Sequence, residues 1–353
     1  MSKDQLTSSE RMHGLINGTY LDRVPFISLA TMYAGNLAGL SSEEFFLNPQ
    51  ASFDAQILCA ELHGCDGSPG FDLPGWMGWD FGGEISFSST RKIAIPKFKK
   101  RAVENTKDAE NLKLPCLNKS YGFKKRLEFY KISRKNNFSV SIPAGSPLEI
   151  VGHIIDPSLL IRWYYKKPEL VHRLLRLATD HILNIADYYI KEFGVENCSA
   201  FSCYPLESNT MVSPKIFKTF SFPYILEIHE QLKQKGVKNF GIHLCGDHKL
   251  NLEYFKEISL PERSLISVSE KMDIELVAKT FGDQYIIGGN VPSTLLLSGN
   301  QRKVFNASKD IIEKMKYHKG GFILMPSCDL PPETPPLNLY AMLKASREFG
   351  SYT

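Results

Sequence analysis

Short runs of apolar and β-branched residues alternate along the chain with longer segments of helical periodicity, and this alternation constrains the fold more than any other feature. Several runs are continuously apolar, which is typical of strands buried on both faces of a parallel sheet. We therefore predict an α/β protein, a (β/α)8 TIM barrel. The eight predicted strands are 24–30, 64–70, 138–142, 197–204, 239–245, 264–270, 284–290 and 322–327.

The helical segments carry recognisable start and stop signals. The segment 213–236 begins with a Ser213 cap and a first-turn proline, and it ends at a glycine. Pro223 inside this segment is expected to kink or divide the helix. The other predicted helices are 168–193, 250–258, 274–282, 301–320 and 336–350.

A long insertion separates the second and third predicted strands. It spans residues 71–137 and includes a predicted hairpin, 83–95, and a basic helix, 122–136. We expect residues 1–353 to form a single barrel domain with this insertion or lid within it. An open doubly wound sheet is the main alternative, but the sequence contains neither a dinucleotide-binding motif nor a P-loop to support it.

Composition excludes several classes of function. The net charge is only +4, and the short basic clusters at 97–101 and 122–126 are interpreted as solvated surface, so nucleic acid is not an expected partner. No stretch of about 18 or more apolar residues predicts a transmembrane helix. The polar residues 1–14 lack the apolar core of a signal peptide, which favours a cytoplasmic location. Seven cysteines, an odd number, are then not expected to form a disulfide framework.

His243, Cys245 and Cys328 lie at strand ends, where a barrel carries out its chemistry. His243 and Cys245 are two residues apart and share one face of the fifth strand, and Gly246 lets the chain turn without covering that face. Cys328 follows the last strand in a stiff, proline-rich segment. One histidine and two cysteines with an open position are a ligand set of catalytic zinc. Ordinary packing of these residues is the alternative, and the pattern alone leaves both open.

Further polar residues are expected at the same rim. Glu270, at the end of the sixth strand, is a candidate fourth ligand or an anchor for His243, with a surface ion pair to Lys271 as the alternative. Asp247 and His248 are interpreted as exposed turn residues. Candidate substrate-binding residues are Asp72, Tyr204, Glu207 and Asn290. Cysteines expected in the core are Cys59, Cys65, Cys116 and Cys198.

Two stretches, "HLCG" at 243–246 and "SCDLPPETP" at 327–335, are the most specific parts of a similarity that runs nearly end to end. The chain resembles the uroporphyrinogen decarboxylase superfamily, and within it the zinc-dependent methylcobamide:coenzyme M methyltransferase branch. This resemblance implies that His243, Cys245 and Cys328 bind zinc. It also implies that zinc activates a thiol acceptor, which takes a methyl group from a methyl-corrinoid.

Departures from the decarboxylase pattern bear on the activity. Where decarboxylases of the family carry an arginine-rich segment for substrate carboxylates, residues 28–39 contain no arginine. A uroporphyrinogen decarboxylase is therefore disfavoured, and a non-catalytic corrinoid-binding member is a third hypothesis.

Tyr204 stands where relatives often have aspartate, and "MPSC" (325–328) replaces an "SPGC" type, so the acceptor need not be coenzyme M.

The corrinoid is expected to belong to another protein. None of the nine histidines has an aspartate two positions before it, so the Asp-x-His-x-x-Gly motif of corrinoid domains is missing. The expected partners are thus a corrinoid protein and a small methyl donor or acceptor, without nucleic acid or membrane, and a homodimer is one option for assembly. The insertion 71–137, with its Trp and Phe residues, is interpreted either as a docking element or as a lid that packs the barrel top.

Overall fold

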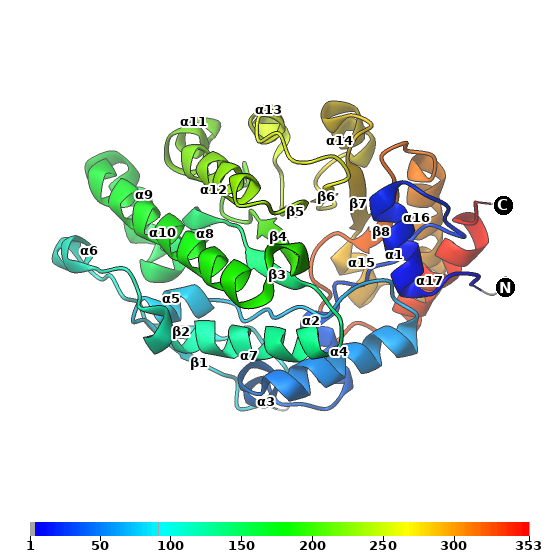
Figure 1. Ribbon diagram of the computed structural model, residues 1–353, viewed down its shortest axis with the longest axis horizontal. Helices are drawn as coiled ribbons and strands as arrows, with labels where there is room; N and C mark the ends of the chain where they lie inside the picture. The colour runs from blue at the N-terminus through cyan, green and yellow to red at the C-terminus, as the bar shows by residue number, and fades with distance from the viewer. Residues whose placement is uncertain (1–3, 91, 353) are drawn as a thin grey trace.

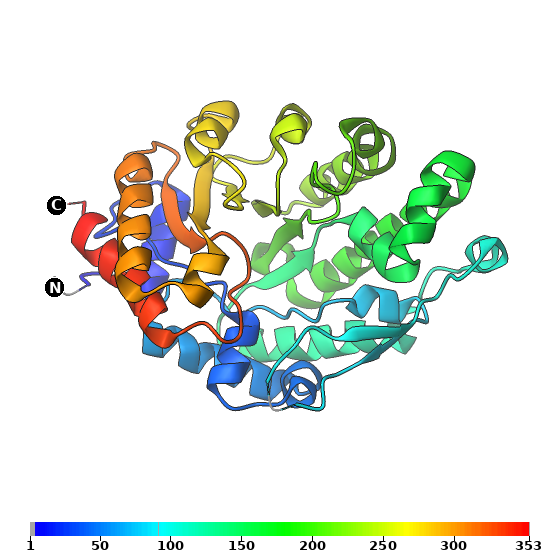
Figure 2. The same ribbon diagram turned by 180° about the vertical axis from the view of Figure 1, so that it is seen from behind.

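Six parallel strands form the central sheet of the computed structural model, which describes residues 4–90 and 92–352. The strands are β3 (Val140–Pro143), β4 (Cys198–Cys203), β5 (Asn239–Leu244), β6 (Leu265–Val268), β7 (Ile286–Val291) and β8 (Phe322–Pro326). They pair in sequence order, and every pair is parallel. All residues of β7 and β8 are buried, as expected for strands covered on both faces. The α/β barrel architecture is confirmed, with the helices outside the strands (Figures 1 and 2).

The first two predicted strands do not form regular strands, so the sheet has six strands where eight were predicted. Within 24–30, Phe26 makes an isolated parallel bridge to Leu324. The Asp66 amide, in the second segment, donates to the Phe26 carbonyl at 2.6 Å. Both segments thus lie where the first two barrel strands were expected, but they make few backbone hydrogen bonds to neighbouring strands. The segment 64–70 contains three glycines and a proline, residues that disfavour a regular strand.

Helices surround the sheet and fill the first third of the chain. Before β3 they are α1 (Ser8–Asn17), α2 (Thr31–Leu37), α3 (Ser42–Leu47), α4 (Pro49–His63), α5 (Trp76–Asp80), α6 (Thr106–Asn111) and α7 (Tyr121–Lys135). After β3 they are α8 (Pro147–Ile154), α9 (Pro157–Lys166), α10 (Pro168–Phe193), α11 (Pro214–Ile216), α12 (Phe222–Gln234), α13 (Leu252–Lys256), α14 (Ile274–Phe281), α15 (Ser293–Ser298), α16 (Gln301–Met315) and α17 (Pro336–Phe349). The predicted helix at 168–193 is confirmed with both of its bounds.

Pro223 divides the predicted helix 213–236, as expected. A π-helical turn, Phe217–Ser221, separates α11 from α12, and Pro223 lies in the first turn of α12. A proline at this point removes one backbone donor from the helical ladder, and the wider turn accommodates that loss.

The insertion packs most of its aromatic residues into the protein. Phe71, Trp76 and Phe81 are buried in the main hydrophobic core. The guanidinium carbon of Arg126, on α7, lies 5.4 Å from the Trp76 ring centre. A two-stranded antiparallel sheet is present, but its strands are β1 (Glu84–Ser86) and β2 (Lys97–Lys100), so the second strand comes later than the predicted hairpin 83–95.

A buried ion-pair network joins α1 to the first two barrel positions. Arg11 contacts Asp22 at 2.7 Å and Asp66 at 2.6 Å, and Arg23 contacts Asp66 at 2.7 Å. Burial opposes ionisation of Asp22, but hydrogen bonds from Arg11 and two backbone amides outweigh it and hold the Asp22 pKa below its usual range. The two chain termini lie on this side of the molecule (Figure 1).

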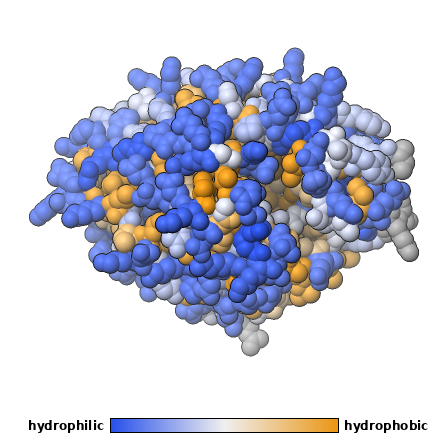
Figure 3. Space-filling view, viewed as in Figure 1, coloured by the Kyte–Doolittle hydropathy of each residue, from blue (hydrophilic) through white to orange (hydrophobic). Residues whose placement is uncertain are grey.

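Within the described residues, no helix is both long and apolar enough to cross a membrane. The face seen in Figure 3 is mostly hydrophilic, with hydrophobic side chains gathered near its centre.

Candidate metal centre

Strand register places three polar side chains in one row at the C-terminal ends of β4, β5 and β6. His243 pairs with Cys203 on β4 and with Ser267 on β6. Side chains that are in register on neighbouring parallel strands point to the same side of the sheet. Accordingly, Ser267 Oγ lies 3.0 Å from His243 Nδ1. This hydrogen bond fixes the orientation of the imidazole ring.

The other ring nitrogen of His243 has the properties of a metal ligand. His243 is 5% exposed, and its Nε2 atom has no hydrogen-bond partner among the described residues. A buried ring nitrogen without a partner is costly unless something else binds it. Imidazole nitrogen is a common zinc ligand, and a second contact to the other nitrogen is the usual way to orient it.

Cys245 and Cys328 come together from distant parts of the chain. Their Sγ atoms lie 3.7 Å apart, and both cysteines are free. In a tetrahedral zinc site with Zn–S bonds of about 2.3 Å, two sulfur ligands lie about 3.8 Å apart. Gly246 adopts a φ of 96°, as the predicted turn after Cys245 requires. The residues present therefore fit a zinc ion.

Backbone hydrogen bonds hold the segment around Cys328 in place. The Ser327 amide donates to the Val291 carbonyl at 2.8 Å, and the Ser293 amide donates to Ser327 Oγ at 3.0 Å. On the other side, the Leu330 amide donates to the Leu29 carbonyl at 2.9 Å. Cys328 is thus anchored on both flanks, although it lies outside a regular strand.

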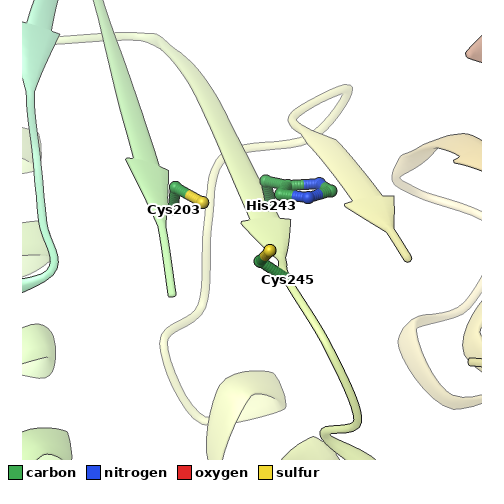
Figure 4. A group of neighbouring side chains, drawn as sticks. All are labelled: Cys203, His243 and Cys245. Carbon is green, nitrogen blue, oxygen red and sulfur yellow. The ribbon is translucent and has the colours of Figure 1, made fainter. Parts of the chain in front are cut away.

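Cys203 belongs to the same cluster, and sequence analysis missed it. One ligand atom each of Cys203, His243 and Cys245 lie within 4.8 Å of one another (Figure 4). Cys203 is the last residue of β4, so its position at a strand end was a usable signal. The register that aligns it with His243 was not readable from the sequence.

Crowding raises the pKa values of the clustered thiols. The hydrogen bond with Cys203, together with burial, raises the pKa of Cys245 to about 12. The hydrogen bond with Cys245, together with burial, raises the pKa of Cys328 to about 12. Without a cation these groups therefore hold their protons. A bound metal ion reverses this balance because it stabilises the thiolate directly.

Carboxyl groups surround the thiols. Burial, with the nearby Glu207 and Asp72, raises the pKa of Glu149 to about 8. Burial also raises the pKa of Asp329, and Cys328 and the exposed Asp72 are among the groups acting on it. The predicted residue Asp72 thus lies among carboxyl groups near the cluster. Glu149 and Asp329 were not predicted, although both closely follow predicted strands.

The remaining predicted rim residues lie around the cluster in different environments. Tyr204 and Glu207 are fully buried, and Glu207 accepts hydrogen bonds from Ser146 and Ser221. The Asn290 amide donates to two backbone carbonyls of the turn that follows β6. Glu270 is exposed in that turn. The assignments of these residues as ligand or substrate-binding groups remain predictions.

Two other expectations are wrong. His248 is fully buried. Its Nε2–H is placed to donate to the carbonyls of Tyr204, at 2.9 Å, and Cys245, at 3.1 Å, and these bonds satisfy the ring nitrogen inside the protein. It therefore fixes the turn after Cys245 instead of facing solvent. Cys116 is exposed, whereas the other cysteines expected in the core, Cys59, Cys65 and Cys198, are buried.

Comparisons with known proteins identify the family and the fold. The family model described as Uroporphyrinogen decarboxylase (URO-D) matches residues 7–349. The methylcobamide:CoM methyltransferase MtbA of Methanosarcina acetivorans is 25% identical over 264 residues, which is 72% of each chain. The methylcobamide:CoM methyltransferase MtaA of Methanosarcina barkeri is 24% identical over 364 residues, 98% of this chain and 99% of that protein. A solved methyltransferase from Methanosarcina mazei has the same fold, with a TM-score of 0.80 at 21% identity over 98% of this chain and 99% of that one.

Proposed function

This chain belongs to the uroporphyrinogen decarboxylase family, and from that premise we propose that it is a zinc-containing, corrinoid-dependent methyltransferase. Its reaction moves a methyl group between a methyl-corrinoid and a thiol or another small acceptor. The observation that carries the proposal is that a ring nitrogen of His243 lies within 4.8 Å of the Cys245 sulfur, and that the Cys328 sulfur lies 3.7 Å from the Cys245 sulfur. The names of the MtbA and MtaA relatives support it.

The residues of the chain have distinct roles in this proposal. His243, Cys245 and Cys328 hold the metal, Ser267 orients the imidazole, and His248 fixes the turn beneath Cys245. A bound zinc ion supplies a positive charge that keeps an acceptor thiol ionised at neutral pH. None of these side chains needs to act as a covalent nucleophile.

The transfer itself needs a corrinoid, and this chain contains no Asp-x-His-x-x-Gly motif that would bind one. A new sulfur–carbon bond forms while the cobalt–carbon bond breaks, and the electron pair of that bond stays on cobalt, which goes from Co(III) to Co(I). The proton of the acceptor thiol leaves to solvent. A separate corrinoid protein that docks at the strand ends, with the insertion 71–137 beside it, is the proposed donor.

Two other functions explain less. A uroporphyrinogen decarboxylase must bind several substrate carboxylates, but residues 28–39 contain no arginine. A non-catalytic corrinoid-binding protein would not need the ligand set at all.

Metal content and methyl transfer test the proposal together. We expect protein purified without chelator to contain about one zinc per chain. We also expect it to demethylate methylcobalamin in the presence of a small thiol, followed by the absorbance change of the corrinoid. Cys328→Ala should abolish both properties, whereas Cys116→Ala, at an exposed cysteine, should change neither.

The other outcomes separate the alternatives. Folded protein that binds no zinc would overturn the proposal. Zinc-containing protein that never demethylates the corrinoid would favour the non-catalytic reading, and turnover of uroporphyrinogen would favour the decarboxylase.

A further inference from the structure

We propose that Cys203 is an additional metal-binding residue, so that the chain alone supplies one histidine and three cysteines to the site. This inference rests on the zinc site of the proposed function and goes beyond its three-residue ligand set. The sequence pattern offered only the position of Cys203 at a strand end, and the cluster around it exists only in the folded barrel.

Strand register gives Cys203 its direction. Cys203 is paired with His243 across β4 and β5, so both side chains leave the sheet on the same side. Figure 4 shows the Cys203 sulfur directed toward β5. Cys198, on the same strand, is five positions earlier and therefore faces the opposite side, where its Sγ donates to the Gly194 carbonyl at 3.3 Å.

The distances suit a shared ligand site. The ligand atoms of Cys203, His243 and Cys245 lie within 4.8 Å of one another, and Cys328 adds a sulfur 3.7 Å from that of Cys245. Ligand atoms of a tetrahedral zinc site lie roughly 3.3–3.8 Å apart, so a movement of at most about 1.5 Å brings the Cys203 sulfur to that spacing from His243 and Cys245. A half-buried side chain at a strand end can make such a movement by a small rotation about its χ1 angle.

The contacts of Cys203 leave its sulfur available. Its hydrogen-bond partner in the cluster is Cys245, which is itself a proposed ligand. Glu270, a candidate for the fourth ligand or for an anchor of His243, is exposed in the turn after β6. Of the two candidates for the fourth position, Cys203 is the one that already lies in the cluster.

A fourth protein ligand has a consequence for the acceptor. Catalytic zinc sites keep a position open, whereas four protein ligands close the site. An acceptor thiol would then have to take the place of one protein ligand, and in this inference that ligand would be Cys203, while the proton of the thiol would leave to solvent. The site would thus admit a thiolate-forming acceptor and exclude water.

Cobalt substitution counts the thiolate ligands directly. We would replace zinc by Co(II) in the full-length protein and measure the sulfur-to-cobalt charge-transfer absorption, which grows with the number of bound thiolates. Cys203→Ser should lower it by about one third, because three thiolates become two. The matched control Cys198→Ser, on the same strand, should leave it unchanged. Adding 2-mercaptoethanol should raise the absorption of Cys203→Ser but not that of the unmodified protein, in which one thiolate replaces another.

A second measurement needs no variant. Alkylation of the zinc-loaded protein, followed by mass spectrometry of its peptides, should show Cys203, Cys245 and Cys328 protected and Cys116 labelled. Labelling of Cys203 with Cys245 and Cys328 protected, or equal absorption in Cys203→Ser, overturns the inference and leaves the proposed function standing. Failure of the unmodified protein to bind either metal overturns both.

Discussion

The sulfur atoms of Cys245 and Cys328 lie 3.7 Å apart, although 83 positions separate the two residues in the chain. A disulfide requires about 2.05 Å, so the two sulfurs are not covalently bonded, and their spacing matches the distance between two sulfur ligands of one zinc ion. The same proximity makes the pair vulnerable once a metal is removed.

Chelation followed by mild oxidation should therefore link Cys245 to Cys328. We expect diamide to produce this disulfide in metal-free protein and not in zinc-loaded protein, because bound thiolates are shielded from attack. Non-reducing peptide mapping identifies the link and distinguishes it from one between Cys203 and Cys245. Equal oxidation with and without zinc would contradict the assignment of the two residues as ligands.

Ser267→Ala should weaken metal binding without removing a ligand. The substitution deletes the hydroxyl that lies 3.0 Å from His243 Nδ1 and orients the ring. Loss of such a partner costs about 10–100-fold in metal affinity. Competition with a metal indicator gives the dissociation constant. The control Ser264→Ala removes a buried hydroxyl just before β6 that bonds the Pro261 carbonyl, so its metal affinity should match that of the unmodified protein.

Asp66→Ala should strongly destabilise the fold. Asp66 accepts hydrogen bonds from Arg11, Arg23 and the Phe26 amide, and its removal leaves two buried guanidinium groups short of a partner. Breaking a buried ion pair in this way costs about 3–5 kcal/mol. Urea unfolding measures the loss. Asp283→Ala removes an exposed ion pair to Lys319 and should leave the midpoint nearly unchanged.

Glu207→Gln should change how stability depends on pH. Burial raises the Glu207 pKa from 4.5 to about 7, and its Oε2 has no partner among the described residues. Between these two pKa values the folded state holds a proton that the unfolded state has lost, so the free energy of unfolding falls as pH rises. The free energy of unfolding that is lost in this way amounts to about 3 kcal/mol once the pH exceeds 7.

The amide of glutamine carries no charge, so the variant should lose this part of the pH dependence. Unfolding of both proteins at pH 5 and pH 8 gives the comparison. The charge of Glu207 also helps to raise the pKa of Glu149, so that pKa should fall in the variant and add to the difference between the two proteins. Parallel pH profiles would show that Glu207 is already ionised in the folded state.

Much of the local structure could be predicted from the sequence because its causes are local. The period of hydrophobic residues and the proline near its start located the helix 168–193, and Pro223 marked the division of its neighbour. The motif H-x-C placed two side chains on one face of a strand, and Gly246 marked the turn behind them. Strands 64–70 and 24–30 were overpredicted, since apolar runs alone do not show whether a neighbouring strand supplies a complete ladder.

By itself, then, the sequence determined the order of helices and strands and the strand ends that carry His243, Cys245 and Cys328. It also determined the glycine that turns the chain directly after Cys245. Only the tertiary structure decided that Cys203 stands in register with His243, that Ser267 holds the ring, and that His248 lies buried beneath the site. The physical reason is that periodicity and turn chemistry act over a few neighbouring residues. Register and burial depend instead on segments tens of residues apart meeting across the barrel.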